Sequence, residues 1–279
     1  IATASSLNWQ GIKPVFADID PDTWCLDPSG IEEAIAPNTQ AIVPVHVFGN
    51  ACEVEKVESI ASKHNLKIIY DASHAFGVRY KGQSLLRYGD AATLSFHATK
   101  LFHTVEGGAI IFRRKEDLER AKQLINFGLD KANSIIEPGI NAKMSEFHAA
   151  VGLCVLDEMF NVLSYREEVV NKYVSRFSEF LKFQKINKFA KTNYSYMPVL
   201  LDSNESVEKV IRSLDEIRVS ARRYFNPCLS SLSFLNSGGV VCKKSKDVAD
   251  RVLCLPLYAG IEDEVVSGIC DKVIEAVCE

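Results

Sequence analysis

The feature of this chain that most constrains its fold is a regular alternation of apolar runs and amphipathic stretches between Gly11 and Phe112. Runs typical of buried strands occupy residues 15–18, 41–47, 68–70, 92–96 and 109–112. Stretches with helical periodicity occupy residues 29–36, where Asp27 or Ser29 is a candidate cap, and 53–64. Strand–helix–strand alternation of this kind predicts an α/β fold with a mostly parallel central sheet.

The second half of the chain has a different pattern. We expect a helix over 115–127, a loop rich in turn-forming residues over 128–141, and a long helix over 145–181. From about residue 194 the pattern becomes α+β, with strands at 196–201 and 252–257 and helices at 207–214 and 262–277. We therefore predict a large domain over residues 1–155, and a long linking helix followed by a small C-terminal domain over 156–279.

Composition excludes several classes of protein. The net charge is −4 without a dense basic block, which argues against nucleic-acid binding. We find neither a signal peptide nor an apolar run that reads as a membrane span, and so expect no membrane association. The eight cysteines form no C-x-x-C pair, which indicates reduced thiols in a cytoplasmic protein. No His/Cys cluster has the spacing of metal ligands, so no metal is expected.

One lysine stands in a setting suited to covalent chemistry. Lys100 ends the polar run that begins at Ser95, and a glycine pair and an apolar strand-like run follow it. A lysine held in a desolvated polar pocket can form a Schiff base with an aldehyde cofactor. The alternative is a surface loop that leads into a hairpin, because most lysines are exposed.

An aspartate upstream of this lysine strengthens the cofactor interpretation. Asp71 directly follows the apolar run 68–70, at the strand end where open α/β sheets place ligand-binding residues. A carboxylate there can pair with a pyridinium nitrogen and keep it protonated, as pyridoxal phosphate chemistry requires. The alternative is that Asp71 caps the next helix. Asp71 and Lys100 in this order favour a cofactor site over either alternative.

Several ordered motifs resemble the DegT/DnrJ/EryC1/StrS family of sugar aminotransferases, and the resemblance covers nearly the whole chain. The motifs are residues 11–20, 41–49, 66–77, 95–112, 141–146 and 251–258. The resemblance implies the pyridoxal-phosphate-dependent transferase fold of type I. It also implies an N-terminal part, with a phosphate-binding Gly-Thr element and a ring-stacking aromatic residue, that would precede Ile1; the sequence as given opens in the middle of a motif.

The resemblance assigns roles to four residues near the predicted cofactor. Lys100 would anchor pyridoxal 5′-phosphate and act as the general base, and Asp71 would hold the pyridine nitrogen protonated. Ser95 would contact the cofactor phosphate, although it could be a simple turn hydroxyl. His74 stands where the family usually has a glutamine that contacts the cofactor; a core histidine without a catalytic task is nearly as good an interpretation.

Three further residues are interpreted through the resemblance. Asn141 matches an asparagine that reaches across a homodimer to the partner's cofactor phosphate, so the active sites would be shared; it could instead cap the helix at Ser145. Lys143 replaces the arginine that is common two residues later and supplies charge without a bidentate fork. Glu106 matches a family glutamate before the glycine pair and is read as a residue on the substrate side.

A basic and aromatic stretch in the C-terminal half is a candidate for substrate binding. Arg222, Arg223 and Tyr224 could grip a diphosphate and stack on a base, or could form a basic turn of the small domain. The stretch resembles the branch of the family that acts at C4 of dTDP-4-keto-6-deoxyhexoses. Enzymes of this branch make dTDP-4-amino-4,6-dideoxyglucose.

The resemblance thus implies a transferase that moves the amino group of glutamate to a nucleotide-linked 4-keto sugar. Such sugars feed O-antigen, lipopolysaccharide or other surface polysaccharides, and the setting would be the bacterial cytoplasm. A sugar dehydratase is a rival, but dehydratases of the family replace the lysine with histidine, which Lys100 argues against. A 3-aminotransferase and a non-catalytic fragment remain alternatives. A nicotinamide-dependent oxidoreductase is disfavoured because no G-x-G-x-x-G follows a strand.

Overall fold

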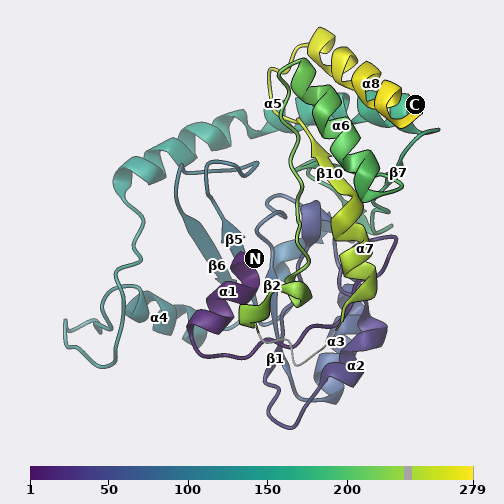
Figure 1. The fold of residues 1–279 in the computed structure, drawn as a ribbon. Helices are drawn as coiled ribbons and strands as arrows, with labels where there is room; N and C mark the ends of the chain where they lie inside the picture. The colour runs from purple at the N-terminus through teal and green to yellow at the C-terminus, as the bar shows by residue number, and fades with distance from the viewer. Residues whose placement is uncertain (236–240, 279) are drawn as a thin grey trace.

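A computed structural model describes residues 1–235 and 241–278 (Figure 1). Its main sheet has the order β1-β2-β5-β6. The strands are β1 (Ala41–Ile42), β2 (Lys67–Asp71), β5 (Ala91–Ser95) and β6 (Gly108–Phe112). The first three run parallel and β6 runs antiparallel to β5, which confirms the mostly parallel sheet. Parallel strands direct their carboxyl ends to one edge, so β2 and β5 bring their last residues together there.

Helices pack against this sheet as their apolar periodicity requires. The helices of this part are α1 (Ala2–Trp9), α2 (Ile31–Ala34), α3 (Val54–Lys63) and α4 (Lys115–Leu124). The predicted helix over 53–64 is confirmed as α3, which buries Val54, Val57 and Ala61 against the core. Short 3₁₀ turns occupy Pro28–Gly30, Val47–Gly49, Leu85–Arg87, Leu229–Ser231 and Ser233–Leu235. The first of these confirms Asp27 as a cap, since its carboxylate accepts a hydrogen bond from the Ser29 amide.

Two of the expected strands are wrong in whole or in part. Residues 15–18 form no strand; Asp18 instead accepts hydrogen bonds from the amides of Lys244 and Ser245, and so caps a helix more than 200 residues away. The run 41–47 is reduced to β1, because Pro44 has no amide hydrogen for the ladder.

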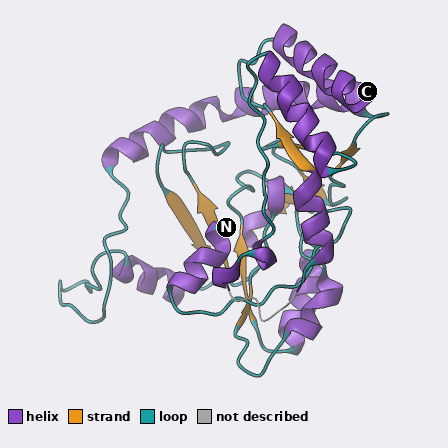
Figure 2. Ribbon diagram, in the orientation of Figure 1, coloured by secondary structure: helices purple, strands orange, loops and turns teal. Residues whose placement is uncertain are grey.

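The C-terminal part forms a second layer around an antiparallel sheet (Figure 2). Its strands, in the order β10-β9-β7, are β7 (Lys182–Phe183), β9 (Met197–Leu200) and β10 (Val252–Leu255). The helices are α6 (Asn204–Glu216), α7 (Lys243–Arg251) and α8 (Asp263–Cys278). A third small sheet, β4-β3-β8, joins the hairpin β3 (Arg79–Tyr80) and β4 (Gln83–Ser84) to β8 (Ala190–Lys191).

One long helix, α5 (Glu146–Phe177), connects the two parts. Ser145 caps it by accepting a hydrogen bond from the amide of His148. Met159 belongs to the core of the main sheet, whereas Tyr173 and Phe177 are fully buried in the core of the second layer. The expected division at residues 155 and 156 therefore falls inside a continuous helix, and the two-domain description remains a proposal.

Within the described residues, α5 is long and apolar enough to cross a membrane by length and composition alone, which the sequence analysis did not anticipate. Two observations argue for a different role. Asp157 and Glu158 interrupt its apolar stretch, and its C-terminal third is packed into the second core. Four apolar side chains in the first half of α5, those of Phe147, Leu153, Leu156 and Phe160, are exposed, which is a property of protein interfaces as well.

Candidate active site

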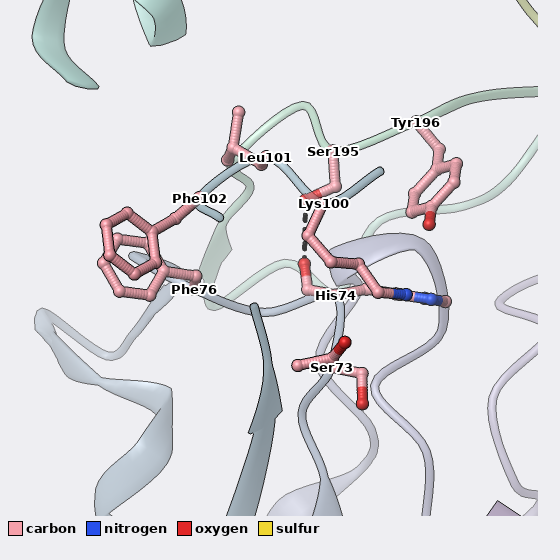
Figure 3. Close-up of a pocket in the computed structure, with 9 residues that line it drawn as sticks. Ser73, His74, Phe76, Lys100, Leu101, Phe102, Ser195 and Tyr196 are labelled. Atoms are coloured by element: carbon pink, nitrogen blue, oxygen red, sulfur yellow. Dashed lines mark hydrogen bonds between the residues drawn. The ribbon is translucent and has the colours of Figure 1, made fainter. Parts of the chain in front are cut away.

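The carboxyl ends of β2 and β5 form one side of a small pocket. Asp71 is the last residue of β2 and pairs with Thr93 of β5, and Ser95 is the last residue of β5. A tight turn after β5 then brings Lys100 back over the strand ends. In this turn the backbone amide of Lys100 donates a hydrogen bond to the carbonyl of His97. The pocket, shown in Figure 3, is lined by Ser73, His74, Phe76, Ser95, Lys100, Leu101, Phe102, Ser195 and Tyr196.

Asp71 is a partly buried carboxylate that stays charged. Burial by itself raises the pKa of Asp71, but hydrogen bonds bring the net pKa below its ordinary value. One carboxylate oxygen accepts a hydrogen bond from the Ser73 amide at 3.0 Å, and the other accepts one from the Thr3 hydroxyl at 2.6 Å. An ionised carboxylate at this place can hold a cationic ring nitrogen.

The amine of Lys100 is half-buried beside that carboxylate. Burial lowers the pKa of Lys100 from its ordinary value, and the charge of Asp71 opposes this effect. Among the described residues, the amine has no hydrogen-bond or ion-pair partner. A lysine of this kind spends more of its time as a neutral, nucleophilic amine than an exposed lysine does.

His74 is a neutral imidazole with one defined tautomer. Burial, helped by the nearby charge of Lys100, lowers the pKa of His74 to about 3, and the charge of Asp71 opposes this effect. Its Nδ1 accepts a hydrogen bond from the Phe48 amide at 3.0 Å, so the proton of the neutral ring resides on Nε2. His74 is therefore able to donate a hydrogen bond from Nε2.

An aromatic cluster surrounds His74. Phe225 stacks on the imidazole at a centroid distance of 5.6 Å and an angle of 6°, and Phe48 stacks at 6.2 Å and 12°. Tyr196 packs at 4.8 Å, and Tyr224 contacts Tyr196 edge-on at 5.8 Å. The sequence-predicted Tyr224 is thus linked to the Lys100 pocket through one intervening ring.

The other predicted substrate residues differ in their availability. Arg223 is engaged inside the second layer, where its guanidinium contacts Glu208 at 2.8 Å, Asn204 at 2.7 Å and the carbonyl of Asp250 at 2.9 Å. Arg222 is exposed, and its guanidinium has no partner among the described residues. Arg222 is consequently the better candidate for an incoming anion.

Glu106 and Asn141 lie outside the pocket of the described chain. Glu106 is exposed and stands 3.7 Å from the imidazole of His97, in the turn that carries Lys100. Asn141 is exposed in the loop between α4 and α5, where its side-chain oxygen accepts from Lys143 at 2.7 Å. Figure 1 shows this loop extending away from the sheet.

Several pocket residues were not anticipated from the sequence. Thr3, which hydrogen-bonds Asp71, and Ser73 both lie in motifs that were noted, so their hydroxyls could have been considered. Ser195 and Tyr196 come from a distant part of the chain, and no local signal marks them. Phe225 follows Tyr224 in the basic and aromatic stretch predicted to bind substrate, and the structure stacks it on His74.

The donor set fits pyridoxal 5′-phosphate. Asp71 suits a protonated pyridine nitrogen, the partly neutral Lys100 suits an aldehyde, and the neutral Nε2–H of His74 suits a ring oxygen. The hydroxyls of Ser95 and Ser73 are donors for a phosphate or a ring substituent.

Comparison with known proteins places the chain in one family. The model of the DegT/DnrJ/EryC1/StrS aminotransferase family matches residues 1–274. A dTDP-4-amino-4,6-dideoxy-D-glucose transaminase from Shigella dysenteriae is 42% identical over 99% of this chain and 77% of the relative. A transaminase of the same description from Escherichia coli is 35% identical over 96% of this chain and 75% of the relative.

Comparison with solved structures agrees with this family assignment. The chain superposes on DesI, determined in the presence of its TDP-sugar product, with a TM-score of 0.92 and 32% identity over 99% of this chain and 72% of that one. A putative sugar aminotransferase from Streptococcus pneumoniae in its PLP form is 24% identical, covers 99% of this chain and 78% of that one, and shares the fold with a TM-score of 0.90. The fold is that of the pyridoxal-phosphate-dependent aminotransferases, and the chain belongs to the DegT/DnrJ/EryC1/StrS aminotransferase family.

Proposed function

We propose that this protein transfers the amino group of glutamate to a dTDP-linked 4-keto-6-deoxy sugar, with pyridoxal 5′-phosphate as its cofactor. The product would be of the dTDP-4-amino-4,6-dideoxyglucose type and would be used for O-antigen or another surface polysaccharide. The protein itself would act in the cytoplasm. The observation that carries the proposal is the partly buried, ionised carboxylate of Asp71 beside the half-buried amine of Lys100. The relatives from Shigella dysenteriae and Escherichia coli, both named as dTDP-4-amino-4,6-dideoxy-D-glucose transaminases, support the choice of substrate.

The residues of the chain divide the chemistry between them. When bound, pyridoxal phosphate supplies an aldehyde for amines and a protonated ring that withdraws electrons. Asp71 would hold a proton on the ring nitrogen, since its pKa lies below the ordinary value. His74 would donate a hydrogen bond from Nε2 to the cofactor, and Ser95 would donate one from its hydroxyl.

Lys100 would move the proton at the substrate carbon. A general base must be neutral at the working pH, and burial favours the neutral amine by lowering the pKa of Lys100. Phe102 and Phe76, whose rings stack on each other at 4.3 Å, add apolar surface to the pocket that holds that amine.

The nucleotide portion would lie toward the stretch 222–225. Arg222 offers an unpaired guanidinium to a diphosphate, and Tyr224 offers a ring to a base. Because Tyr224 reaches the pocket through Tyr196 and His74, a sugar attached to the diphosphate would extend toward Lys100.

We also propose that the protein is a homodimer with shared active sites. The first half of α5 exposes Phe147 at 87% and Phe160 at 81%, and the preceding loop exposes Ile135 and Ile140. Apolar patches of this kind mark interaction surfaces. A second copy would cover them, and Asn141 and Lys143 lie in the same loop, where they could reach a partner's phosphate.

The first prediction concerns the charge of Lys100. The rate of acetic anhydride labelling of Lys100 in the chain without added cofactor, measured by mass spectrometry against pH, should give a midpoint below the ordinary 10.5. Asp71→Asn removes a charge that raises the pKa of Lys100, so the midpoint should fall further. Asp90→Asn is the matched control and should leave the midpoint unchanged, because Asp90 precedes β5 and its carboxylate binds the Ile68 amide near the start of β2, at the edge of the sheet opposite Asp71. A midpoint at 10.5, or a rise in Asp71→Asn, contradicts the assignment.

The second prediction tests the activity. With glutamate and dTDP-4-keto-6-deoxyglucose, the enzyme should form 2-oxoglutarate and a 4-amino sugar, detected by mass spectrometry and NMR. Lys100→Ala should remove turnover while the circular dichroism spectrum is kept, because the amine is replaced and no hydrogen bond is lost. Lys67→Ala, also on the main sheet, is the control. Turnover that survives in Lys100→Ala, or an amine placed at C3, would reject the stated function.

The third prediction tests the dimer. Phe160→Glu should convert a dimer into a monomer in sedimentation velocity, because a charge would be buried in the interface. Activity should fall as the dimer is lost, since Asn141 could no longer reach the second site. Ile217→Glu, an exposed apolar residue at the end of α6, should leave the dimer intact. A wild-type protein that sediments as a monomer at all concentrations rules out the shared site.

A further inference from the structure

Residues 193–196, which we call the crossing segment, run between β8 and β9 and pass beside the loop that follows β2. Asn193 is only 2% exposed, and Ser195 is buried as well. Two buried polar side chains in a connecting segment require hydrogen-bond partners, and those partners identify their role.

The side chains of Asn193 and Ser195 both donate a hydrogen bond to the same atom. The Nδ2 of Asn193 and the hydroxyl of Ser195 each lie 2.8 Å from the backbone carbonyl oxygen of His74 (Figure 3 shows the serine bond). The Asn193 amide also donates to the carbonyl of Phe76 at 2.8 Å. A carbonyl oxygen accepts two hydrogen bonds, so that of His74 is fully used and its direction is fixed.

The ring of His74 is held by a separate hydrogen bond. Its Nδ1 accepts from the Phe48 amide, and Gly49 follows with φ of +87°. A Cβ on Gly49 would overlap the side-chain oxygen of Asn193 and lie 3.1 Å from the carbonyl of His74. The glycine therefore permits the close approach of Asn193 to His74.

The crossing segment is itself fixed by α5. Arg166 donates to the carbonyls of Tyr194 and Ser195, each at 3.0 Å. Burial lowers the pKa of Arg166 to about 10, and among the described residues it has no carboxylate partner. A buried guanidinium bonded to backbone carbonyls is costly to place, which points to a need for accurate geometry at this position.

We propose that Asn193 and Ser195 are positioning residues for the cofactor pocket, which act through His74 and are held in place by Arg166. They fix the backbone of His74 and keep its Nε2–H facing the pocket beside Lys100. The proposal rests on the proposed function, because it takes the pocket to be the cofactor site.

The first arm of the test measures cofactor binding by the full chain. Titration with pyridoxal 5′-phosphate, followed by absorbance, should show a dissociation constant about tenfold higher in Asn193→Ala, equivalent to about 1.4 kcal/mol. Asn187→Ala is the matched control, since Asn187 is also buried and its Nδ2 also donates to two carbonyls, those of Ala51 and Cys52. It should lower the melting temperature and leave the dissociation constant within about twofold of the wild type.

Ser195 supplies a milder test if Asn193→Ala does not fold. Ser195→Ala leaves the Asn193 bond to the His74 carbonyl intact, and it should weaken binding by about threefold. Ser195→Thr keeps the hydroxyl and should restore binding, which a role in packing alone would not predict.

The second arm needs no cofactor. In protein labelled selectively with ¹⁵N-histidine, the ring of His74, identified by its absence in His74→Gln, should show the Nε2–H tautomer in the wild type. Asn193→Ala should shift or broaden that signal, whereas Asn187→Ala should not. If the wild type fails to bind pyridoxal phosphate, the proposed function fails and the NMR arm alone decides. An unchanged His74 signal, or equal effects of the two asparagine variants in both arms, would overturn the proposal.

Discussion

The site depends on keeping the carboxylate of Asp71 charged inside the protein. Burial opposes the charge, and two hydrogen bonds, from the Thr3 hydroxyl and the Ser73 amide, reverse the balance. The parallel arrangement of β2 and β5 then places this charge at the sheet edge to which the chain returns with Lys100. The lowered pKa of Lys100 and the neutral state of His74 are both set in this buried environment.

The second constraint is that side chains from both parts of the chain line the pocket. The helix α5 contributes to both cores, and Arg166, near its middle, holds the crossing segment against the loop after β2. Aromatic rings from both parts, Phe48 from one side and Tyr196 and Phe225 from the other, enclose His74. The geometry of the cofactor pocket is thereby tied to the relative position of the two parts.

Local pattern predicted the elements that a short window of sequence determines. The strand ending at Asp71 and the helix α3 follow from apolar periodicity, and Asp71 is a candidate for cofactor binding because of its place at a strand end. The strand expected at 15–18 was wrong because Asp18 caps α7, a tertiary contact that no local pattern contains.

The contacts around His74 could not be predicted for the same reason. Asn193 lies 119 residues beyond His74 in the chain, and only the folded arrangement of β8 and β9 brings its amide to the carbonyl. Arg222 and Arg223 are adjacent and alike in sequence, yet only the fold distinguishes the exposed guanidinium from the one that is bonded to Glu208.

The central claim is that Lys100 and Asp71 form one cofactor site, and borohydride reduction tests it most directly. The purified protein would be mixed with pyridoxal 5′-phosphate, its visible spectrum recorded, and the mixture reduced and mapped by peptide mass spectrometry. The account predicts a yellow absorption band that reduction removes, with the label on the peptide that carries Lys100. A band whose reduction labels another lysine, with Lys100 unmodified, would contradict it.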